Sequence, residues 1–271
     1  MPLLLLALFS HSAWPAADQN DPQTSEIWSK VRQSLFEARP IETSADAVIQ
    51  LDAPVRAEDA AVVPISIKVQ APQTADRFIR KIYLVIDHNP SPIAAVFTLF
   101  PDSGRADLET RVRIDEYTHV RAIAETSDGK LYMATRYVKA SGGCSAPAGK
   151  DAEAALANLG KIRFRVDPDV RIDKPNIAQL MISHPNNSGF AMDQVTRLFV
   201  PSHYVRQINV TYAGRPVLSA DVDFSISENP NFRFYFVPHG PGTLQAEVVD
   251  SSDLNFKSAI DVKPGKAMPE S

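Results

Sequence analysis

Residues 62–69, VVPISIKV, indicate the fold class, because their apolar side chains alternate with polar or proline positions. A period of two places every second side chain from Val63 onward on one face of a β-strand. Turn signals rich in Pro, Asn, Ser and Gly separate this stretch from similar ones at residues 48–51, 79–87, 94–99, 108–114, 119–125 and 131–138. About seven short strands of this kind predict an antiparallel β-sandwich.

A second block of strand-like sequence follows residue 160. Ala213 and Gly214 fit the tight turn of a hairpin, and Phe232, Phe234 and Phe236 line one face of a strand. Strands are expected at residues 162–166, 177–182, 205–212, 215–222, 232–237 and 242–250. The chain is therefore predicted to be all-β, with two immunoglobulin-like antiparallel β-sandwich domains at residues 25–139 and 161–262, a connector at residues 140–160 and a tail at residues 263–271.

A short helix is predicted before the first strand, over residues 25–36. Ile27, Val31 and Leu35 share one face at four-residue spacing, with Trp28 beside them, and Ser25 is a suitable N-cap. We expect this amphipathic helix to dock on the first domain. An exposed Trp28 would instead indicate contact with a partner.

The chain begins with an apolar run, MPLLLLALF, followed by small and polar residues. This is the pattern of a secretory signal peptide, although no Lys or Arg precedes the run, and it is too short to span a bilayer. We expect residues 1–17 to be removed on export. The net charge of −4, with 22% charged and 44% apolar residues, is typical of a soluble globular protein and argues against nucleic acid or an anionic membrane as a partner.

The single cysteine, Cys144, lies in the connector, within KASGGCSAPAGK at residues 139–150. Gly142 and Gly143 precede it and small residues follow it, a composition typical of an exposed, flexible arm. One thiol cannot form an internal disulfide, so Cys144 is expected to react with another molecule. The alternative is a linker with a buried or inert thiol, since free cysteines are often buried. Further along, residues 151–159 are rich in helix formers and predict a short helix within the connector.

The rest of the sequence offers little catalytic chemistry. No histidine lies within twenty residues of Cys144, so a Cys–His pair would have to form through folding. The histidines lack metal-ligand spacing, and one cysteine excludes a thiolate zinc cluster and a c-type haem, so no metal or cofactor is predicted. Arg111 and Arg113 alternate with apolar residues, which predicts a solvated strand face or a surface for a partner or an anionic cargo.

An ordered series of short motifs resembles the SoxY subunit of the sulfur-oxidation carrier, over about residues 25–144. The motifs are VPI at 63–65, DHNPSP at 87–92, TRVR at 110–113, SDGKLY at 127–132 and GGC at 142–144. The resemblance implies that Cys144 carries sulfur intermediates covalently, on an arm that swings at Gly142 and Gly143. In that family the cysteine lies on a glycine-rich tail, whereas here Ser145 and Ala146 follow it and the chain continues.

The second block resembles SoxZ, the usual partner subunit of SoxY, over about residues 170–262. The motifs are SHP at 183–185, Gly189, VP at 200–201, SENPNF at 227–232 and Asp250. The chain therefore looks like a fusion of SoxY and SoxZ, similar to the SoxYZ-like carriers that accompany quinoprotein dehydrogenases. Such a fusion makes the pairing of the two domains intramolecular.

Together these features predict a periplasmic, non-enzymatic protein that carries thiosulfate-derived intermediates on Cys144. The resemblance implies partner enzymes of the c-type cytochrome and hydrolase kinds, or a quinoprotein dehydrogenase system. Two alternatives stay open. In one, the chain is a binding or assembly module for a periplasmic quinoprotein dehydrogenase or cytochrome, and the cysteine is incidental. In the other, it is a thiol-dependent enzyme.

Overall fold

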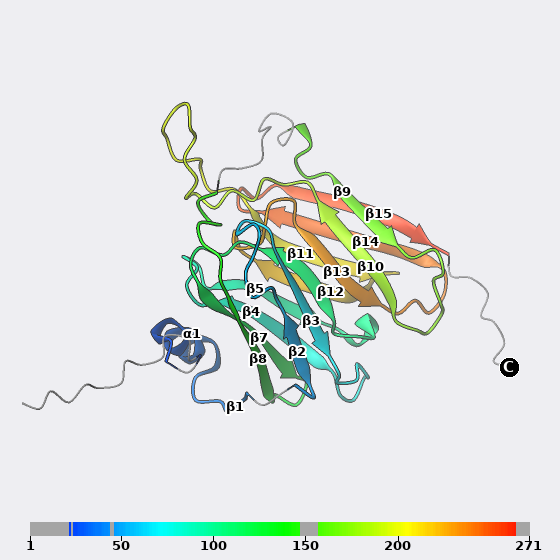
Figure 1. The fold of residues 1–271 in the computed structure, drawn as a ribbon. Coiled ribbons are helices and arrows are strands. Elements are labelled where there is room, and N and C mark those ends of the chain that lie inside the picture. Colours follow the sequence, from blue (N-terminus) through cyan, green and yellow to red (C-terminus); the bar gives the residue numbers. More distant parts are fainter. Residues whose placement is uncertain (1–21, 23, 44–45, 147–156, 264–271) are drawn as a thin grey trace, which may run out of the picture.

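Two β-sheets pack face to face in the computed structural model, which describes residues 22, 24–43, 46–146 and 157–263 (Figure 1). The nine-stranded sheet has the order β1-β8-β7-β4-β5-β12-β11-β14-β15, and the six-stranded sheet has the order β2-β3-β6-β13-β10-β9. The first half of the chain supplies α1 (Glu26–Phe36), β1 (Ile41–Glu42), β2 (Ile49–Asp52), β3 (Val63–Val69), β4 (Ile79–Ile86), β5 (Ile93–Leu99), the 3₁₀ helix η1 (Pro101–Ser103), β6 (Leu108–Val112), β7 (Thr118–Thr126) and β8 (Leu131–Val138). The second half supplies β9 (Ile162–Val166), β10 (Asn176–Ile182), β11 (Val205–Tyr212), β12 (Arg215–Val222), β13 (Asn231–Phe236), β14 (Gly242–Asp250) and β15 (Asn255–Val262).

The sheets run without interruption from one half of the chain into the other. In the larger sheet β5 pairs with β12, from Leu99 opposite Leu218 to Ala95 opposite Val222. In the smaller sheet β6 lies beside β13. One buried apolar cluster draws residues from both halves. Pairing β5 with β12 satisfies strand edges that would otherwise expose unpaired backbone groups.

The predicted all-β class, the β-sandwich and the short helix are confirmed. Each half contributes strands to both sheets, as a sandwich requires, but the sequence did not indicate that the two halves share their sheets and their core. The expected strands are all present, and the Ala213-Gly214 turn between β11 and β12 has positive φ at both residues, as a tight hairpin needs. The short β1 and the last strand, β15, were not predicted.

Helix α1 covers the outer face of the larger sheet near β4, β7 and β8. The Ser25 side chain accepts a hydrogen bond from the Trp28 backbone N–H (3.1 Å), which confirms the predicted N-cap. Trp28 is buried, so the prediction of a helix docked on the first domain is confirmed and the alternative of an exposed Trp28 is not. The guanidinium of Arg121 lies 4.5 Å from the Trp28 ring centroid and forms a fully buried ion pair with Asp87 (2.6 Å).

Several predictions fall on parts of the chain that the structure leaves undescribed. These are the signal peptide at residues 1–17, most of the connector helix at residues 151–159, and nearly all of the tail at residues 263–271. Within the described residues, no helix has the length and apolar character needed to cross a membrane.

Candidate functional site

Cys144 lies on a segment, residues 140–146, that follows β8 and runs along the chain just after β6. Two backbone hydrogen bonds attach it there: Gly142 N–H donates to the carbonyl of Asp115 (2.8 Å), and Gly143 N–H donates to that of Ile114 (2.9 Å). The backbone N–H of Cys144 donates to Asp115 Oδ1 (3.3 Å). On the other side, the Ser188 hydroxyl, from the loop after β10, donates to the Cys144 carbonyl. Both halves of the chain therefore hold this segment, which we call the cysteine segment.

Glycine is needed at positions 142 and 143 for different structural reasons. Gly142 has φ of +79°, a conformation that glycine adopts without strain. At Gly143 the limit is space, because a Cβ there would lie 2.1 Å from the carbonyl oxygen of Ala60 and 2.7 Å from that of Ile114. Gly143 thus lets the cysteine segment approach two backbone carbonyls closely.

Cys144 is only 1% exposed, so the prediction of an exposed arm is wrong for the cysteine segment as the structure describes it. The prediction rested on the absence of large apolar neighbours in sequence. Burial comes instead from hydrogen bonds to the chain after β6 and to Ser188, and from the close approach to the Ala60 carbonyl that Gly143 allows. The sequence had left a buried cysteine open as the alternative. The swinging role of Gly142 and Gly143 and the attachment role of Cys144 stay predictions.

Burial makes the thiol unreactive in this position. It raises the pKa of the Cys144 thiol to about 12, with a further contribution from Asp115 in the same direction and an opposing one from Arg113. The thiolate is the nucleophilic form, so the docked sulfur is protonated and inert near neutral pH. The charged groups that act on the thiol are two aspartates, the second being Asp223, and Arg113; none of them is a histidine.

Arg113 does not lie on the solvated strand face that the sequence predicted. Strand β6 ends at Val112, so the alternation stops there; Arg111 is exposed, whereas Arg113 turns inward and is only 3% exposed. Its Nη1 donates to the carbonyl of Gly143 (3.4 Å). Its Nη2 donates to the carbonyls of Pro185 (3.4 Å) and Asn186 (3.3 Å). Arg113 therefore joins the cysteine segment to the loop after β10.

Asn89 fixes the chain on which the cysteine segment rests. Its Nδ2 donates to the carbonyl of Arg113 (2.8 Å) and to Ser225 Oγ (3.0 Å), and its Oδ1 accepts from the backbone N–H of Asp115 (2.9 Å). Asn89 and Ser225 come from different halves of the chain. In the sequence Asn89 stood out only as part of a motif, and its role follows from contacts that no spacing reveals.

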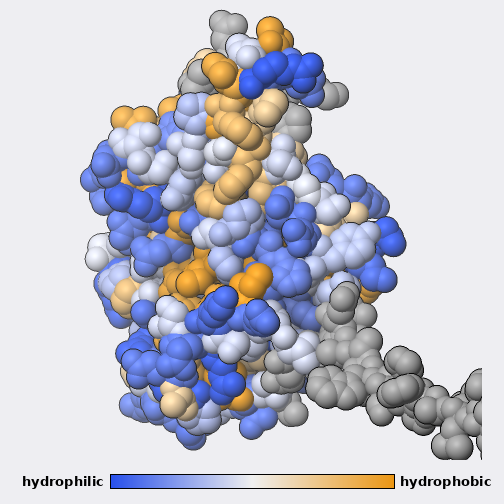
Figure 2. Space-filling model, turned by 90° about the vertical axis from the view of Figure 1, so that its left-hand side faces the viewer, coloured by the Kyte–Doolittle hydropathy of each residue, from blue (hydrophilic) through white to orange (hydrophobic). Residues whose placement is uncertain are grey.

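An exposed apolar loop projects from the same end of the molecule. It lies between β10 and β11 and folds back on itself, with Met192 opposite Phe199 (Figure 1). Figure 2 looks onto this end and shows orange, apolar side chains on the part that projects at the top. We call residues 190–199 the apolar loop. Its exposed large apolar side chains are Phe190 (45%), Met192 (43%), Val195 (91%), Leu198 (69%) and Phe199 (63%).

Folding brings together His184, His203 and Asp250, which are far apart in sequence. The Nε2 atoms of His203 and His184 lie 2.7 and 3.5 Å from Asp250 Oδ2. The backbone N–H of Asn186 donates to His184 Nδ1 (3.0 Å), so the neutral His184 ring carries its proton on Nε2, facing Asp250. Burial lowers the pKa of His184 to about 4, which keeps the ring neutral at pH 7.

A metal ion at this cluster would need the lone pair of His184 Nε2. That would require moving the ring proton to Nδ1, where it would face the Asn186 N–H, another donor. His203 hydrogen-bonds to Asp250, whereas His184 Nε2 has no hydrogen-bond partner among the described residues, and the proton that it carries disfavours a metal centre at this cluster.

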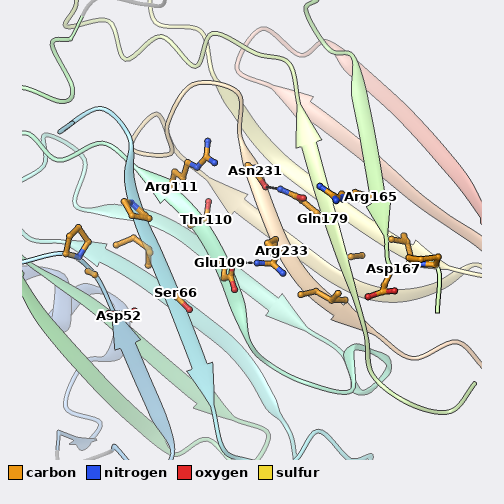
Figure 3. A pocket seen from close by; sticks show the side chains of 18 residues that line it. Asp52, Ser66, Glu109, Thr110, Arg111, Arg165, Asp167, Gln179, Asn231 and Arg233 are labelled. Carbon is orange, nitrogen blue, oxygen red and sulfur yellow. Dashed lines mark hydrogen bonds and ion pairs between the residues drawn. The ribbon is translucent and has the colours of Figure 1, made fainter. Parts of the chain in front are cut away.

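An open groove of about 920 Å³ crosses the outer face of the smaller sheet (Figure 3). Glu109 and Arg233 form an ion pair across it (2.8 Å), and Gln179 Nε2 donates to Asn231 Oδ1 (2.9 Å). Strands of both halves line it, but none of the residues that hold the cysteine segment does. The groove is thus a separate feature of the surface.

Comparison with known proteins gives two family matches. Residues 32–144 match the model of sulfur oxidation protein SoxY, and residues 164–261 match that of sulphur oxidation protein SoxZ. Cys144 is the last residue of the first match. No curated protein matches the sequence.

Three solved structures illustrate the structural likenesses. The sulfur carrier protein SoxY from Chlorobium limicola f thiosulfatophilum is 28% identical over 42% of this chain and 90% of that chain, with a TM-score of 0.35. A superoxide reductase (neelaredoxin) from Ignicoccus hospitalis is 17% identical over 36% and 93% of the two chains, with a TM-score of 0.33. The fibronectin(III)-like modules of Clostridium thermocellum CbhA are 12% identical over 83% and 97%, with a TM-score of 0.24. TM-scores this low support no functional conclusion.

The two family matches cover most of the chain, in the order SoxY and then SoxZ, and residues 145–163 separate them. Both families belong to sulfur oxidation. The chain therefore belongs to the SoxY and SoxZ families, joined in a single polypeptide as a SoxYZ fusion.

Proposed function

We propose that this SoxYZ fusion is a non-enzymatic carrier that holds thiosulfate-derived sulfur intermediates covalently on Cys144. The observation that carries the proposal is the position of the only cysteine, at the end of the SoxY match and on a segment of small residues held mainly by backbone hydrogen bonds. Each such bond contributes about 0.5–1.5 kcal/mol net. A few bonds of this size allow the segment to detach and dock again.

The docked and detached positions would divide the work of a carrier. When docked, the thiol is buried and protonated, and so it is protected from stray reactions. When detached, it regains the ordinary pKa of about 8.5 and can react inside a partner enzyme. The roughly 20 residues of the connector extend at most about 3.3–3.6 Å each, so a loop tethered at both ends reaches about 35 Å.

The compartment and the partners belong to the same proposal. The apolar run at the N-terminus supports export to the periplasm. The partners would be sulfur-oxidising enzymes of the cytochrome and hydrolase kinds, or a quinoprotein dehydrogenase system. Among the described residues, the charged groups that act on the thiol are Asp115, Asp223 and Arg113, and they form no Cys–His pair of the kind that a thiol-dependent enzyme commonly uses.

A second candidate is an assembly module in which the sandwich binds a quinoprotein dehydrogenase or a cytochrome and the cysteine is incidental. Two observations favour it: the thiol is buried, and the apolar loop beside it exposes five large apolar side chains. Exposed apolar clusters often mark protein contacts.

One experiment separates the two candidates. The intact mass of the protein isolated from its native cells is measured before and after reduction, with the adduct located by peptide mapping. A carrier shows a reducible added mass on Cys144 that matches sulfane sulfur or thiosulfate, and Cys144→Ser abolishes pathway activity while the fold is kept. An unmodified thiol in the presence of the native partners, with full activity of Cys144→Ser, would leave the assembly module.

A further inference from the structure

We propose that Arg113 forms an anion-binding subsite for the group carried on Cys144, so that the loaded cysteine segment docks with its negative charge against the guanidinium. The inference rests on the proposed carrier function and adds a residue that recognises the cargo. The ligand class is a sulfur-linked oxyanion or sulfur anion, such as an S-thiosulfonate or a persulfide.

The first observation is a buried cation with spare hydrogen-bonding capacity. Arg113 is 3% exposed, and its Nε has no hydrogen-bond partner among the described residues. The carboxylates of Glu228 and Asp59 stabilise its charge, yet burial still lowers the pKa of Arg113. Native proteins rarely leave a buried polar group such as this Nε–H unsatisfied without a functional reason. The terminal nitrogens bond to three carbonyl oxygens at 3.3–3.4 Å, longer than the 2.7–3.2 Å usual for N–H···O bonds.

The second observation is the location of this cation. Its Nη1 bonds to the carbonyl of Gly143, the residue directly before Cys144. Among the described residues, Arg113 is also the only cation that acts on the Cys144 thiol, and Asp115 and Asp223 act in the opposite sense. While the thiol is neutral, the sulfur itself offers the guanidinium no negative charge, although the carboxylates of Asp115 and Asp223 lie near it. A cargo that ends in a sulfonate or a sulfur anion would supply one.

Guanidinium chemistry matches such a cargo. Its planar N–H groups form strong, charge-assisted bonds to oxyanions, often in pairs. An oxyanion can take up the unpartnered Nε–H and replace one of the long carbonyl contacts. The docked, loaded state would then shield the adduct from thiols and other nucleophiles until a partner draws the segment out.

Loading without any enzyme provides the test. The Cys144 thiolate attacks a central sulfur of tetrathionate, which forms the cysteine S-thiosulfonate and releases one thiosulfate, while the thiol proton goes to solvent. The rate at which dithiothreitol removes this adduct from the full chain is followed by intact mass. The same measurement is made for Arg113→Gln, for Arg113→Lys, and for the control Arg111→Gln, whose exposed arginine lies two residues away.

The subsite predicts that Arg113→Gln loses the adduct at least ten-fold faster than the unchanged chain, that Arg113→Lys is intermediate, and that Arg111→Gln matches the unchanged chain. Alkylation of the unloaded thiol by iodoacetamide must change less than removal of the adduct does. Equal acceleration of both rates would mean that Arg113 only supports the local structure, and would overturn the proposal.

A neutral adduct keeps the test valid even if the Arg113 variants fold poorly. Methyl methanethiosulfonate places an uncharged methylthio group on Cys144 of the unchanged chain. Relative to the same two adducts on a short peptide of residues 139–150, the anionic adduct should be protected at least five-fold more than the neutral one. Equal protection contradicts the subsite. Because loading is chemical, this result is independent of whether native protein carries sulfur, which tests the proposed function separately.

Discussion

The cysteine segment and the apolar loop lie at the same end of the molecule and reverse the usual relation between composition and burial. The cysteine segment consists of small residues, yet Cys144 is 1% exposed. The apolar loop carries large apolar residues, yet Val195 is 91% exposed. The difference is in backbone attachment: the cysteine segment bonds to the carbonyls of Ile114 and Asp115, whereas the apolar loop bonds mostly to itself, from Asp193 to Leu198.

In these two segments, burial follows backbone hydrogen bonds and available space more closely than it follows side-chain hydrophobicity. A segment without bulky side chains can enter a narrow groove and satisfy its N–H groups there. A loop with bulky side chains stays outside when its backbone is already paired. Four measurements test this contrast.

The largest effect is expected for Gly143→Ala. The added Cβ would lie 2.1 Å from the carbonyl oxygen of Ala60. A backbone carbonyl cannot turn aside as a flexible side chain can, so the cysteine segment has to leave its docked position. The thiol pKa then falls from about 12 toward 8.5, and alkylation by iodoacetamide at pH 7.5 should accelerate by about 10- to 1,000-fold. Ser145→Ala, at an exposed neighbour, is the control and should change the rate little. An unchanged rate for Gly143→Ala would show that docking does not protect the thiol.

The second effect is the loss of stability in Asn89→Ala. This variant removes the hydrogen-bond partner of the Arg113 carbonyl, the Ser225 hydroxyl and the Asp115 backbone N–H. It should lower the free energy of unfolding by about 1–3 kcal/mol. Urea denaturation measures it, with Asn255→Ala on the exposed edge strand β15 as the control. A loss below about 0.5 kcal/mol would contradict the role of Asn89 as the support of the site.

The third effect is a pH dependence of docking. The docked thiol has a raised pKa, so docking favours the protonated thiol. The stability that this preference gives to the docked state is complete below the ordinary thiol pKa and declines as the pH rises from about 9 toward 12. Between pH 8 and pH 10 the docked population should fall roughly ten-fold relative to the detached one. Hydrogen exchange of residues 140–146, corrected for intrinsic pH effects, measures this. Cys144→Ser should show no such dependence, and an identical dependence in that variant would refute it.

The smallest effect is expected in the apolar loop. Leu198→Ser replaces a side chain that is 69% exposed, so the free energy of unfolding should change by no more than about 0.5 kcal/mol. The fully buried Leu180 on β10 gives the matched control, since Leu180→Ser should cost several kcal/mol, about 2–5. Thermal or urea unfolding distinguishes them. A loss of more than 1 kcal/mol for Leu198→Ser would mean that the loop packs against the body.

The strands were predictable because most of them alternate between core and surface. Strand β3 alternates strictly in burial, and its sequence does so too. Strand β15 was missed because only Val262 is buried in it, so its apolar residues show no period; pairing with β14 forms it. The shared sheets were not predictable, because edge pairing between β5 and β12 depends on how two halves meet.

The site was predictable in part. The residue Cys144 and its glycines stood out by composition, and the motif around Asn89 stood out by resemblance. The burial of Cys144 was not predictable, since it depends on carbonyls from residues 60 and 114. Nor was the inward turn of Arg113, because strand alternation predicts its direction only as far as Val112, where β6 ends.

The continuous sheets have a consequence for how such a protein can be encoded. The ladders β5–β12 and β6–β13 hold the two halves together without the peptide bonds of the connector. We expect a chain cut between residues 146 and 157 to keep its two halves associated. One gene for the whole chain and two genes for the separate halves would then be alternative ways to make the same sandwich. The covalent link is then not needed for assembly, and its length and sequence are free to be shaped by the cysteine that it carries.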